Sequence, residues 1–221
     1  MGTLYVVATP IGNLQDITLR ALEILRTVKV VACEDTRVTR KLLAHFEIGT
    51  PTVSLHHHSS DSEIERLVSR VVSGEDVAYV SDAGTPGVSD PGGKLAEVAY
   101  KAGVRVVPLP GASSVSTLLS ASGFPSDQYQ FLGYFPRKKG RQTLLKALPD
   151  FELTTVFFEA PYRIVKTLED IASAVPQKEV VVGREMTKQF EEIMRGSAHE
   201  IFEHFKQKEP KGEYVIVIRG N

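Results

Sequence analysis

The sequence has one cysteine, almost no net charge and no long apolar run, and each shortage excludes a class of protein. Cys33 is the only cysteine among the 221 residues, so the chain can form neither an internal disulfide nor a structural zinc site made of several cysteines. It carries 26 basic and 27 acidic residues, a net charge of -1. Overall charge therefore cannot hold the protein on nucleic acid, and any polyanion must meet a local group of cations.

No targeting segment is recognisable at the amino terminus. Residues 1–3 carry no Lys or Arg, and the apolar run Leu4–Ala8 that follows is too short for a signal peptide or a membrane span. We therefore expect a soluble cytoplasmic protein that does not contact membranes.

The sequence also lacks the common signatures of several enzyme classes. It has no G-x-S-x-G elbow, no Walker loop and no G-x-G-x-x-G after a strand, which argues against a hydrolase, a nucleoside triphosphatase or an ordinary dinucleotide-binding protein. Three histidines, His56–His58, stand together, but neighbours on an extended segment point to opposite faces and no H-x-x-x-H spacing lies nearby. We interpret them as solvated or substrate-edge side chains and expect no metal.

The first half of the chain alternates apolar runs with segments of helical spacing. A helix is predicted from Thr18, another after the capping box Ser60-x-x-Glu63, and a small-residue helix over Ser113–Ser122. The alternation predicts an α/β domain with a parallel sheet. The predicted buried strands are Leu4–Ala8, Val28–Cys33, Thr52–Leu55, Val77–Val80 and Val104–Leu109.

The pattern breaks at Gly123–Asp127 and then resumes, which predicts a second α/β domain. We place the boundary so that the domains are residues 1–122 and 123–221, with a ligand cleft between them. The segment Phe190–Arg195 fits either a strand or a helical turn. The predicted strands are Phe131–Phe135, Thr154–Phe158, Lys178–Gly183 and Tyr214–Ile218, and the predicted helices are Arg141–Leu148, Tyr162–Val175 and Ala198–Lys206.

Glycine- and proline-rich loops follow three of the first-half strands. The longest, Ser81–Gly92, has more residues than a bare turn needs, and its glycines and prolines end the strand while leaving main-chain amides open. Thr9–Asn13 and Pro110–Ser114 follow two other strands, although Thr9–Asn13 alone also fits a simple turn. Because the carboxyl ends of parallel strands share one sheet edge, the three loops should converge there and bind a small ligand.

Four charged segments have two interpretations each. Cys33–Arg37 fits a helix start capped by its Asp or Thr, the wall of a site, or both. Arg137–Arg141 places four cations beside two aromatic residues; it is either a solvated loop or a docking point for a phosphate backbone, and we favour nucleic acid. Phe157–Arg163 and Arg184–Lys188 follow second-half strands and either form caps and ion pairs or complete the pocket.

Six of these segments together resemble the bacterial family of ribosomal RNA small subunit methyltransferase I enzymes, within the tetrapyrrole methylase superfamily. The resemblance covers nearly the whole chain. It implies two α/β domains that enclose S-adenosylmethionine, and commonly a homodimer. It further implies 2'-O-methylation of a cytidine ribose in the decoding region of 16S rRNA, as free RNA or in the small ribosomal subunit. The matching segments are Thr9–Thr18, Cys33–Arg37, Ser81–Gly87, Pro110–Ser114, Phe158–Arg163 and Arg184–Lys188.

The resemblance also implies which residues bind the cofactor, and the charge pattern suggests which contact RNA. Contacts to the cofactor are expected from Pro10, Gly12, Asp82, Ala83, Gly84, Thr85, Pro86, Ala112, Ser113, Ser114, Ala160, Met186 and Thr187. Contacts to RNA are expected from Arg37, Arg137, Lys138, Lys139, Arg141, Arg163 and Arg184. Some members of the family carry an extension beyond the catalytic region, so part of an RNA-binding surface is expected to be missing after Asn221.

A sulfonium methyl group is already activated, so the enzyme mainly has to align the ribose hydroxyl and exclude water. The hydroxyl proton needs an acceptor, and Glu159, Asp35 and Lys188 are the unranked candidates. Two other functions stay open. One is methylation of a tetrapyrrole carbon, although such enzymes usually have a G-x-G-x-G-D loop where this chain has Thr9–Asn13. The other is a non-catalytic RNA-binding protein that keeps the pocket as a relic.

Overall fold

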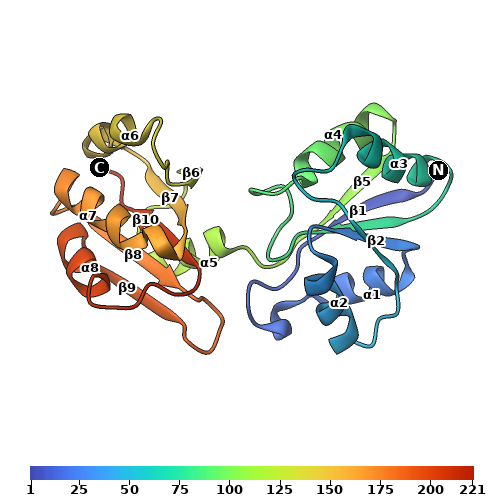
Figure 1. The fold of residues 1–221 in the computed structure, drawn as a ribbon, viewed down its shortest axis with the longest axis horizontal. Coiled ribbons are helices and arrows are strands. Elements are labelled where there is room, and N and C mark those ends of the chain that lie inside the picture. Colours follow the sequence, from blue (N-terminus) through green and yellow to red (C-terminus); the bar gives the residue numbers. More distant parts are fainter. The chain divides into compact units, whose positions relative to one another are not determined.

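The computed structural model describes all 221 residues, and the chain forms two compact units, Met1–Ser113 and Ser114–Asn221 (Figure 1). The division lies earlier than the sequence predicted, because helix α5 (Ser114–Ser122) belongs to the second unit. Its residues Val115, Leu118 and Leu119 are buried in an apolar cluster with strands of that unit. The apolar face of α5 therefore places this helix in the second unit. Gly123, with φ +67°, marks only the end of the helix and not the boundary between the units.

The first unit contains five parallel strands, as the sequence predicted, and their order in the sheet is β3-β2-β4-β1-β5. The central strands β2 and β4 are buried throughout, but the edge strands β3 and β5 are partly exposed. Burial on both faces thus holds only for the centre of the sheet. The strands are β1 (Thr3–Val7), β2 (Val30–Cys33), β3 (Thr52–Ser54), β4 (Val77–Val80) and β5 (Arg105–Leu109).

Four helices cover this sheet, two on each face (Figure 1). Helices α1 (Leu19–Thr27) and α2 (Thr36–His45) lie on one face, and α3 (Asp61–Val72) and α4 (Gly92–Lys101) on the other. The Thr18 hydroxyl accepts the Ala21 amide at 3.1 Å, and the capping box at Ser60 is formed. Neighbouring strands β1 and β4 lead into helices on opposite faces, so the switch point of the sheet lies between them.

The second unit is built on a mixed sheet in the order β6-β7-β10-β8-β9. Only β6 and β7 are parallel, and β9 pairs antiparallel with β8, so the segment with two interpretations is a strand. The strands are β6 (Tyr129–Tyr134), β7 (Thr154–Glu159), β8 (Glu179–Arg184), β9 (Glu192–Ser197) and β10 (Tyr214–Ile218).

Helices α6 (Arg141–Ala147), α7 (Ile164–Ala174) and α8 (Ala198–Phe205) pack on one face of the second sheet and α5 on the other. The turn Pro161–Arg163 that precedes α7 is a 3-10 helix, so α7 begins later than predicted. The chain also has short 3-10 helices at Leu14–Asp16 and Leu148–Asp150. None of the helices combines the length and the apolar character needed to span a bilayer.

Candidate functional site

The three glycine- and proline-rich loops meet at the carboxyl edge of the first sheet. Thr9 and Gly84 form an antiparallel bridge in which each amide donates to the other residue's carbonyl at 3.0 Å. The Thr9 hydroxyl donates to the Ser81 carbonyl at 3.2 Å, and the Thr85 hydroxyl donates to the Ala112 carbonyl at 3.0 Å. The loops after β1, β4 and β5 thus form one structure at the switch point of the sheet, where open α/β sheets bind ligands.

Two glycines allow the backbones of these loops to approach closely. Gly84 has φ +83°, and a Cβ placed there would lie 3.3 Å from the Ile11 side chain and 3.6 Å from the Ala112 carbonyl oxygen. A Cβ on Gly111 would lie 2.7 Å from the Ala8 Cβ. Meanwhile the amides of Ala83 and Thr85 donate no hydrogen bond within the chain. The loops therefore pack closely against one another and leave these two main-chain donors without an acceptor in the chain.

The carboxylate of Asp90 orders the second half of the long loop. It accepts the amides of Gly87 at 2.7 Å, Gly92 at 2.7 Å and Val88 at 3.2 Å. The hydroxyl of the fully buried Tyr79 donates to the same carboxylate at 3.3 Å, which ties the loop to the middle of β4. Sequence reasoning missed this role of Asp90, although an Asp just before Pro91-Gly92 and a helix start is a typical capping signal.

Acidic side chains gather at the same edge. The Asp35 amide donates to the Asp82 carboxylate at 3.0 Å, which connects the loops after β2 and β4. Glu34 lies next to this contact and is half-buried. Burial raises the pKa of Glu34, and the negative charges of Asp82 and Asp90 raise it further. The edge thus combines free main-chain amides with a concentration of negative charge.

Asp35 caps the amino terminus of α2, which was one of the two interpretations of the segment Cys33–Arg37. Its carboxylate accepts the Arg37 amide at 2.8 Å and begins α2. It also binds the Arg37 guanidinium, with Nη2 at 2.6 Å, and this contact lowers the pKa of Asp35 to about 2. A carboxylate with so low a pKa is a poor proton acceptor near neutral pH, so the geometry speaks against a catalytic role for Asp35.

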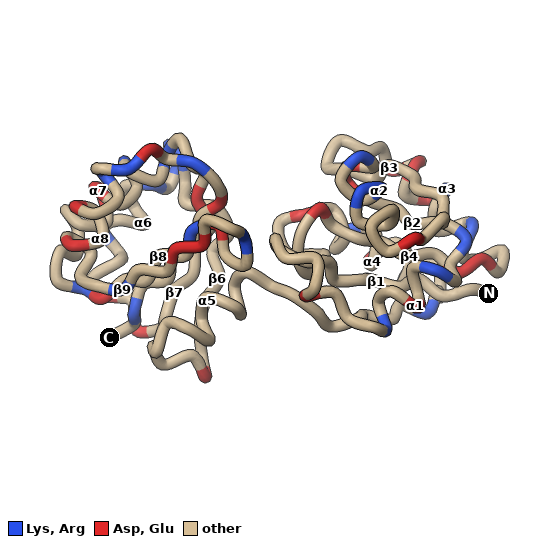
Figure 2. Tube along the Cα trace, turned by 90° about the horizontal axis from the view of Figure 1, so that it is seen from below, with Lys and Arg blue, Asp and Glu red and all other residues tan.

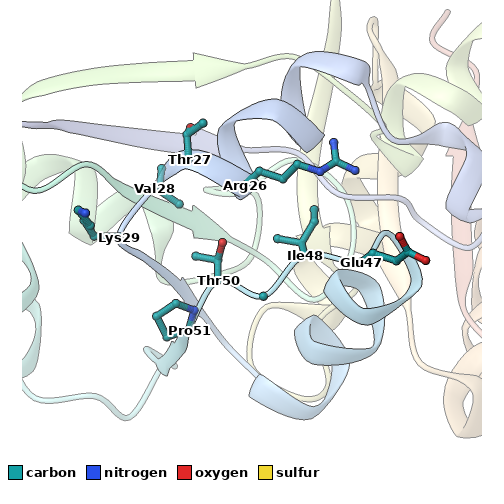
Figure 3. Close-up of a pocket in the computed structure, with 9 residues that line it drawn as sticks. Arg26, Thr27, Val28, Lys29, Glu47, Ile48, Thr50 and Pro51 are labelled. Carbon is teal, nitrogen blue, oxygen red and sulfur yellow. The ribbon is translucent and has the colours of Figure 1, made fainter.

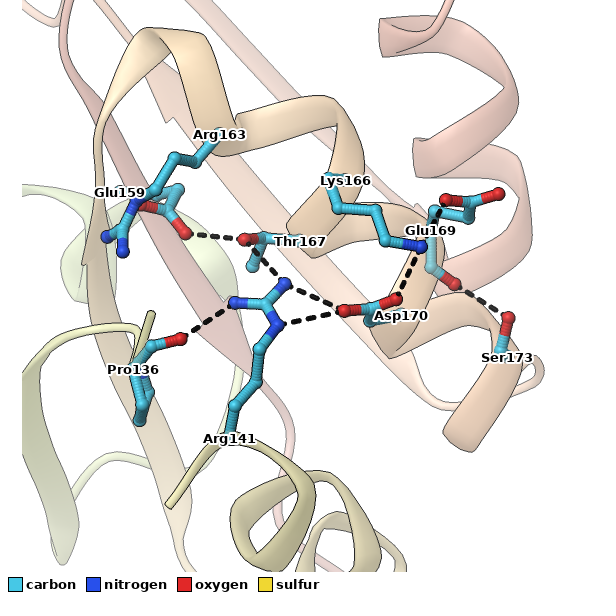
Figure 4. A network of polar contacts seen from close by, with 9 residues as sticks. All are labelled: Pro136, Arg141, Glu159, Arg163, Lys166, Thr167, Glu169, Asp170 and Ser173. Carbon is cyan, nitrogen blue, oxygen red and sulfur yellow. Dashed lines mark hydrogen bonds and ion pairs between the residues drawn. The ribbon is translucent and has the colours of Figure 1, made fainter. Parts of the chain in front are cut away.

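Glu159 lies at the end of β7, buried among donors. One carboxylate oxygen accepts the Ala160 amide at 2.7 Å, the other accepts the Thr167 hydroxyl at 2.5 Å, and Arg163 forms an ion pair with it (Figure 4). Only 2% of the residue is exposed. Because both oxygens are engaged, Glu159 holds the turn between β7 and α7 together instead of standing free to accept a proton.

The segment Arg184–Lys188 has a strained backbone. Glu185 and Thr187 have φ of +48° and +67°, a conformation that is unusual for residues other than glycine and rare for β-branched ones. The side chain of Met186 is buried against Gly183, where a Cβ would lie 2.7 Å from its sulfur. Such strain is common at binding sites, which agrees with the ligand role that the resemblance implies for Met186 and Thr187.

Lys188 is held as a cation in this segment. Its ammonium group donates to Glu185 at 2.9 Å and to Glu213 at 2.8 Å. Partial burial works against its charge, but the hydrogen bonds to Glu213 and Glu185 outweigh it and raise the pKa of Lys188. At neutral pH Lys188 is therefore protonated and cannot act as a base.

The expected RNA-contacting residues differ sharply in their surroundings. Arg141 is mostly buried: it forms an ion pair with Asp170 at 2.8 Å and donates to the Pro136 carbonyl at 2.8 Å (Figure 4). Its guanidinium also lies over the Phe135 ring. Arg184 has an 18% exposed side chain and donates to the Lys211 carbonyl. These two arginines serve the interior of the second unit, and a phosphate could not reach Arg141 without breaking its ion pair.

The other expected cations are accessible to different degrees. Lys138 and Lys139 are exposed and form no ion pair, and Arg137 has no acidic partner. Arg37 is 85% exposed but bound to Asp35. Figure 2 shows basic and acidic residues interspersed along both units. The exposed part of the expected basic patch is therefore residues 137–139.

Pockets lie within each of the two units. One, of about 540 Å³, is at the amino-terminal edge of the first sheet, lined by Arg26–Lys29 and Glu47–Pro51 (Figure 3). It lies at the opposite edge of the sheet from the three loops, and Arg26 is already bound to the Phe46 carbonyl at 3.2 Å. The other, of about 470 Å³, is in the second unit between the ends of β6 and β7. The chain has no group of three His, Cys, Asp or Glu side chains arranged for a metal.

Comparison with known proteins identifies the family. The family model described as Tetrapyrrole (Corrin/Porphyrin) Methylases matches residues 3–201. The chain belongs to this family. Two solved structures share its fold: diphthine synthase superposes with a TM-score of 0.77 at 17% identity, covering 99% of this chain and 90% of the other. A uroporphyrin-III-C-methyltransferase from Thermus thermophilus gives 0.66 at 21% identity, covering 98% and 94%.

Closer relatives confirm the resemblance found in the sequence. A protein named ribosomal RNA small subunit methyltransferase I from Halalkalibacterium halodurans is 43% identical over 100% of this chain and 76% of its own length. Proteins of the same name from Thermotoga maritima, at 43%, and Escherichia coli O157:H7, at 44%, also match 100% of this chain, and 99% and 78% of their own lengths.

Proposed function

We propose that this protein is an S-adenosylmethionine-dependent methyltransferase that methylates the 2'-oxygen of a cytidine ribose in the decoding region of 16S rRNA. The observation that carries the proposal is the identity of 43–44% over the whole chain to relatives named ribosomal RNA small subunit methyltransferase I. The cytoplasmic location and the homodimer expected from the sequence belong to the same proposal.

The carboxyl edge of the first sheet suits the cofactor. The free amides of Ala83 and Thr85 can donate to polar groups of a small ligand, and the close packing of Gly84 against Ile11 and Ala112 fixes the loops that carry these amides. The negative charge of Asp82 and its acidic neighbours favours a cation. When bound, S-adenosylmethionine supplies a methyl group on a positively charged sulfur. Contacts from Ala160, Met186 and Thr187 remain part of the proposal through the resemblance.

The ribose hydroxyl proton has to be accepted as the new bond forms, and Glu34 is the carboxylate best suited to accept it. Asp35, Glu159 and Lys188 are each held by partners that keep them from acting as a base. Glu34 lies at the same sheet edge, and its pKa is raised by burial and by Asp82 and Asp90. A raised pKa strengthens a carboxylate as a base at physiological pH.

The test is transfer of a labelled methyl group from S-adenosylmethionine to small ribosomal subunits that lack the modification, followed by mapping of the labelled nucleotide. Naked 16S rRNA serves as a second substrate, and a porphyrinogen tests the tetrapyrrole alternative. Label on a cytidine 2'-oxygen supports the proposal, whereas label in the macrocycle would replace it by tetrapyrrole methylation. If the protein binds small subunits but neither binds S-adenosylmethionine nor transfers the labelled methyl group, it is a non-catalytic RNA-binding protein.

A further inference from the structure

The pocket in the second unit carries positive charge and aromatic surface together. It has a volume of about 470 Å³, within the range typical of small-ligand sites, and is lined by Tyr134, Phe135, Pro136, Arg137, Ala160 and Arg163. The first four residues end or follow β6, and the last two follow β7, its parallel neighbour. The pocket therefore lies where the segments that follow β6 and β7 meet at one edge of the second sheet.

Arg163 has donors that the protein does not use. Its guanidinium forms an ion pair with Glu159, but Nε and Nη1 are buried and have no hydrogen-bond partner (Figure 4). Buried donors without partners are unfavourable, and an arginine can bind two oxygens of a phosphate side by side. Glu159 reaches only the Nη2 group of this guanidinium, and its oxygens also accept from Ala160 and Thr167, so Nε and Nη1 are left without an acceptor. The arrangement therefore favours an anion entering the pocket.

Arg137 adds a second cation without an acidic partner. It donates to the hydroxyl of Tyr162 at 2.9 Å, which fixes its direction without reducing its charge. Lys138 and Lys139 follow it on the exposed loop. The pocket thus has two arginines on its lining and further cations beside it, of which only Arg163 is paired with a carboxylate.

Exposed aromatic rings lie beside these cations. Tyr134 is 58% exposed and Tyr162 70% exposed, although tyrosine usually buries most of its ring. One side of the Tyr134 ring is held by Phe158, with the ring centres 5.6 Å apart. Exposed rings beside cations are the arrangement with which proteins bind single-stranded nucleic acid, by stacking bases and pairing phosphates. Here Arg137 has no acidic partner, and Arg163 has two donors without an acceptor.

We propose that this pocket binds one nucleotide of a single-stranded RNA segment, with a phosphate at Arg137 and Arg163 and a base stacked on Tyr134. The proposal rests on the proposed function in that RNA is the substrate. S-adenosylmethionine fits the lining less well, because it carries two positive groups and one carboxylate. Ala160, which the resemblance places with the cofactor, also lines this pocket, so the cofactor and the nucleotide would be neighbours there.

The experiment measures the affinity of the full-length protein for a short fluorescein-labelled single-stranded RNA over a range of salt concentrations. Arg137→Gln should lower the slope of log affinity against log salt by roughly one unit, because one phosphate contact is lost. Tyr134→Ala should weaken binding roughly tenfold at every salt concentration without changing the slope. Arg163→Lys keeps the charge but not the paired donors, and should weaken binding as well.

The matched control is Lys146→Gln, which removes one exposed charge on α6 away from the pocket lining and should alter neither quantity. Unchanged RNA affinity and slope in Arg137→Gln and Tyr134→Ala would overturn the pocket, even if methyl transfer to ribosomal RNA by the wild type upholds the proposed function. A loss of S-adenosylhomocysteine binding in these variants, with RNA binding intact, would assign the pocket to the cofactor. Absence of methyl transfer by the wild type would count against the function alone.

Discussion

The guanidinium of Arg141 binds the carboxylate of Asp170 at 2.8 Å inside the second unit, where their side chains are 12% and 17% exposed. Arg141 also donates to the Thr167 hydroxyl at 3.1 Å, and Thr167 in turn donates to Glu159 (Figure 4). The arginine that the sequence placed in an RNA-binding patch therefore joins α6, α7 and the end of β7.

Removing Arg141 should destabilise the protein. We expect Arg141→Met to lower the free energy of unfolding by about 3 kcal/mol, because one partner of a buried ion pair is lost and Asp170 keeps only Lys166. Urea denaturation followed by circular dichroism measures this. Lys139→Met, which removes an exposed cation without an ion pair, should change stability by less than about 0.5 kcal/mol. Equal stabilities of the two variants would show that the ion pair contributes nothing.

Gly84 should be essential to the shape of the cofactor edge. In Gly84→Ala, the new Cβ would meet Ile11 while the backbone stays at φ +83°, so we expect a loss of about 1–2 kcal/mol in stability. S-adenosylhomocysteine binding, measured by calorimetry, should weaken at least tenfold because the loops move apart. Gly49→Ala, where nothing lies within 4 Å and φ is not positive, is the control and should bind normally. Normal binding by Gly84→Ala would remove the loops from the cofactor site.

Sequence patterns predicted the features of this fold that depend on residues close together in the sequence. The apolar runs identified the five parallel strands, the capping box at Ser60 identified a helix start, and the loops converge as the rule for parallel sheets requires. The membership of α5 could not be predicted in this way. It depends on packing against β8 and β10, which lie far along the chain.

The candidate site was predicted less completely, because a charged residue looks the same in a sequence whether it is free or paired. Arg141 and Lys139 stand two positions apart in one basic run, yet the first is mostly buried in an ion pair and the second is exposed. Likewise Glu159 and Asp35 looked like available carboxylates until their donors were known. Only the fold shows which charges are already neutralised.

Asp90 should control the order of the long loop. In Asp90→Ala, the amides of Gly87, Val88 and Gly92 lose their common acceptor, and we expect a loss of about 2 kcal/mol in stability. Hydrogen exchange of residues 85–92 should speed up and cofactor binding should weaken. Tyr79→Phe, which removes only the 3.3 Å contact to Asp90, should have a much smaller effect. Slow exchange of the loop in Asp90→Ala would mean that other contacts order it.

The pH dependence of methyl transfer should reveal whether Glu34 is the base. The base must be deprotonated, so the rate should fall as the pH drops through the raised pKa of Glu34, at a higher pH than for an ordinary exposed glutamate. Glu34→Gln should lower the rate at neutral pH by roughly 10²-fold or more and abolish this acidic limb. A limb that persists in Glu34→Gln would belong to another group.

A second variant tests the cause of the raised pKa rather than the residue itself. The charge of Asp82 raises the pKa of Glu34, so Asp82→Asn should lower that pKa and move the acidic limb of the rate to lower pH. Because Asp82 is also an expected cofactor contact, the rates must be compared at saturating S-adenosylmethionine. A limb that moves in Asp82→Asn and disappears in Glu34→Gln can only come from Glu34, since the two changes act on the same proton by different means. If Asp82→Asn weakens cofactor binding but does not move the acidic limb of the pH–rate profile, the acidic residues at this sheet edge contribute to cofactor binding and not to proton transfer.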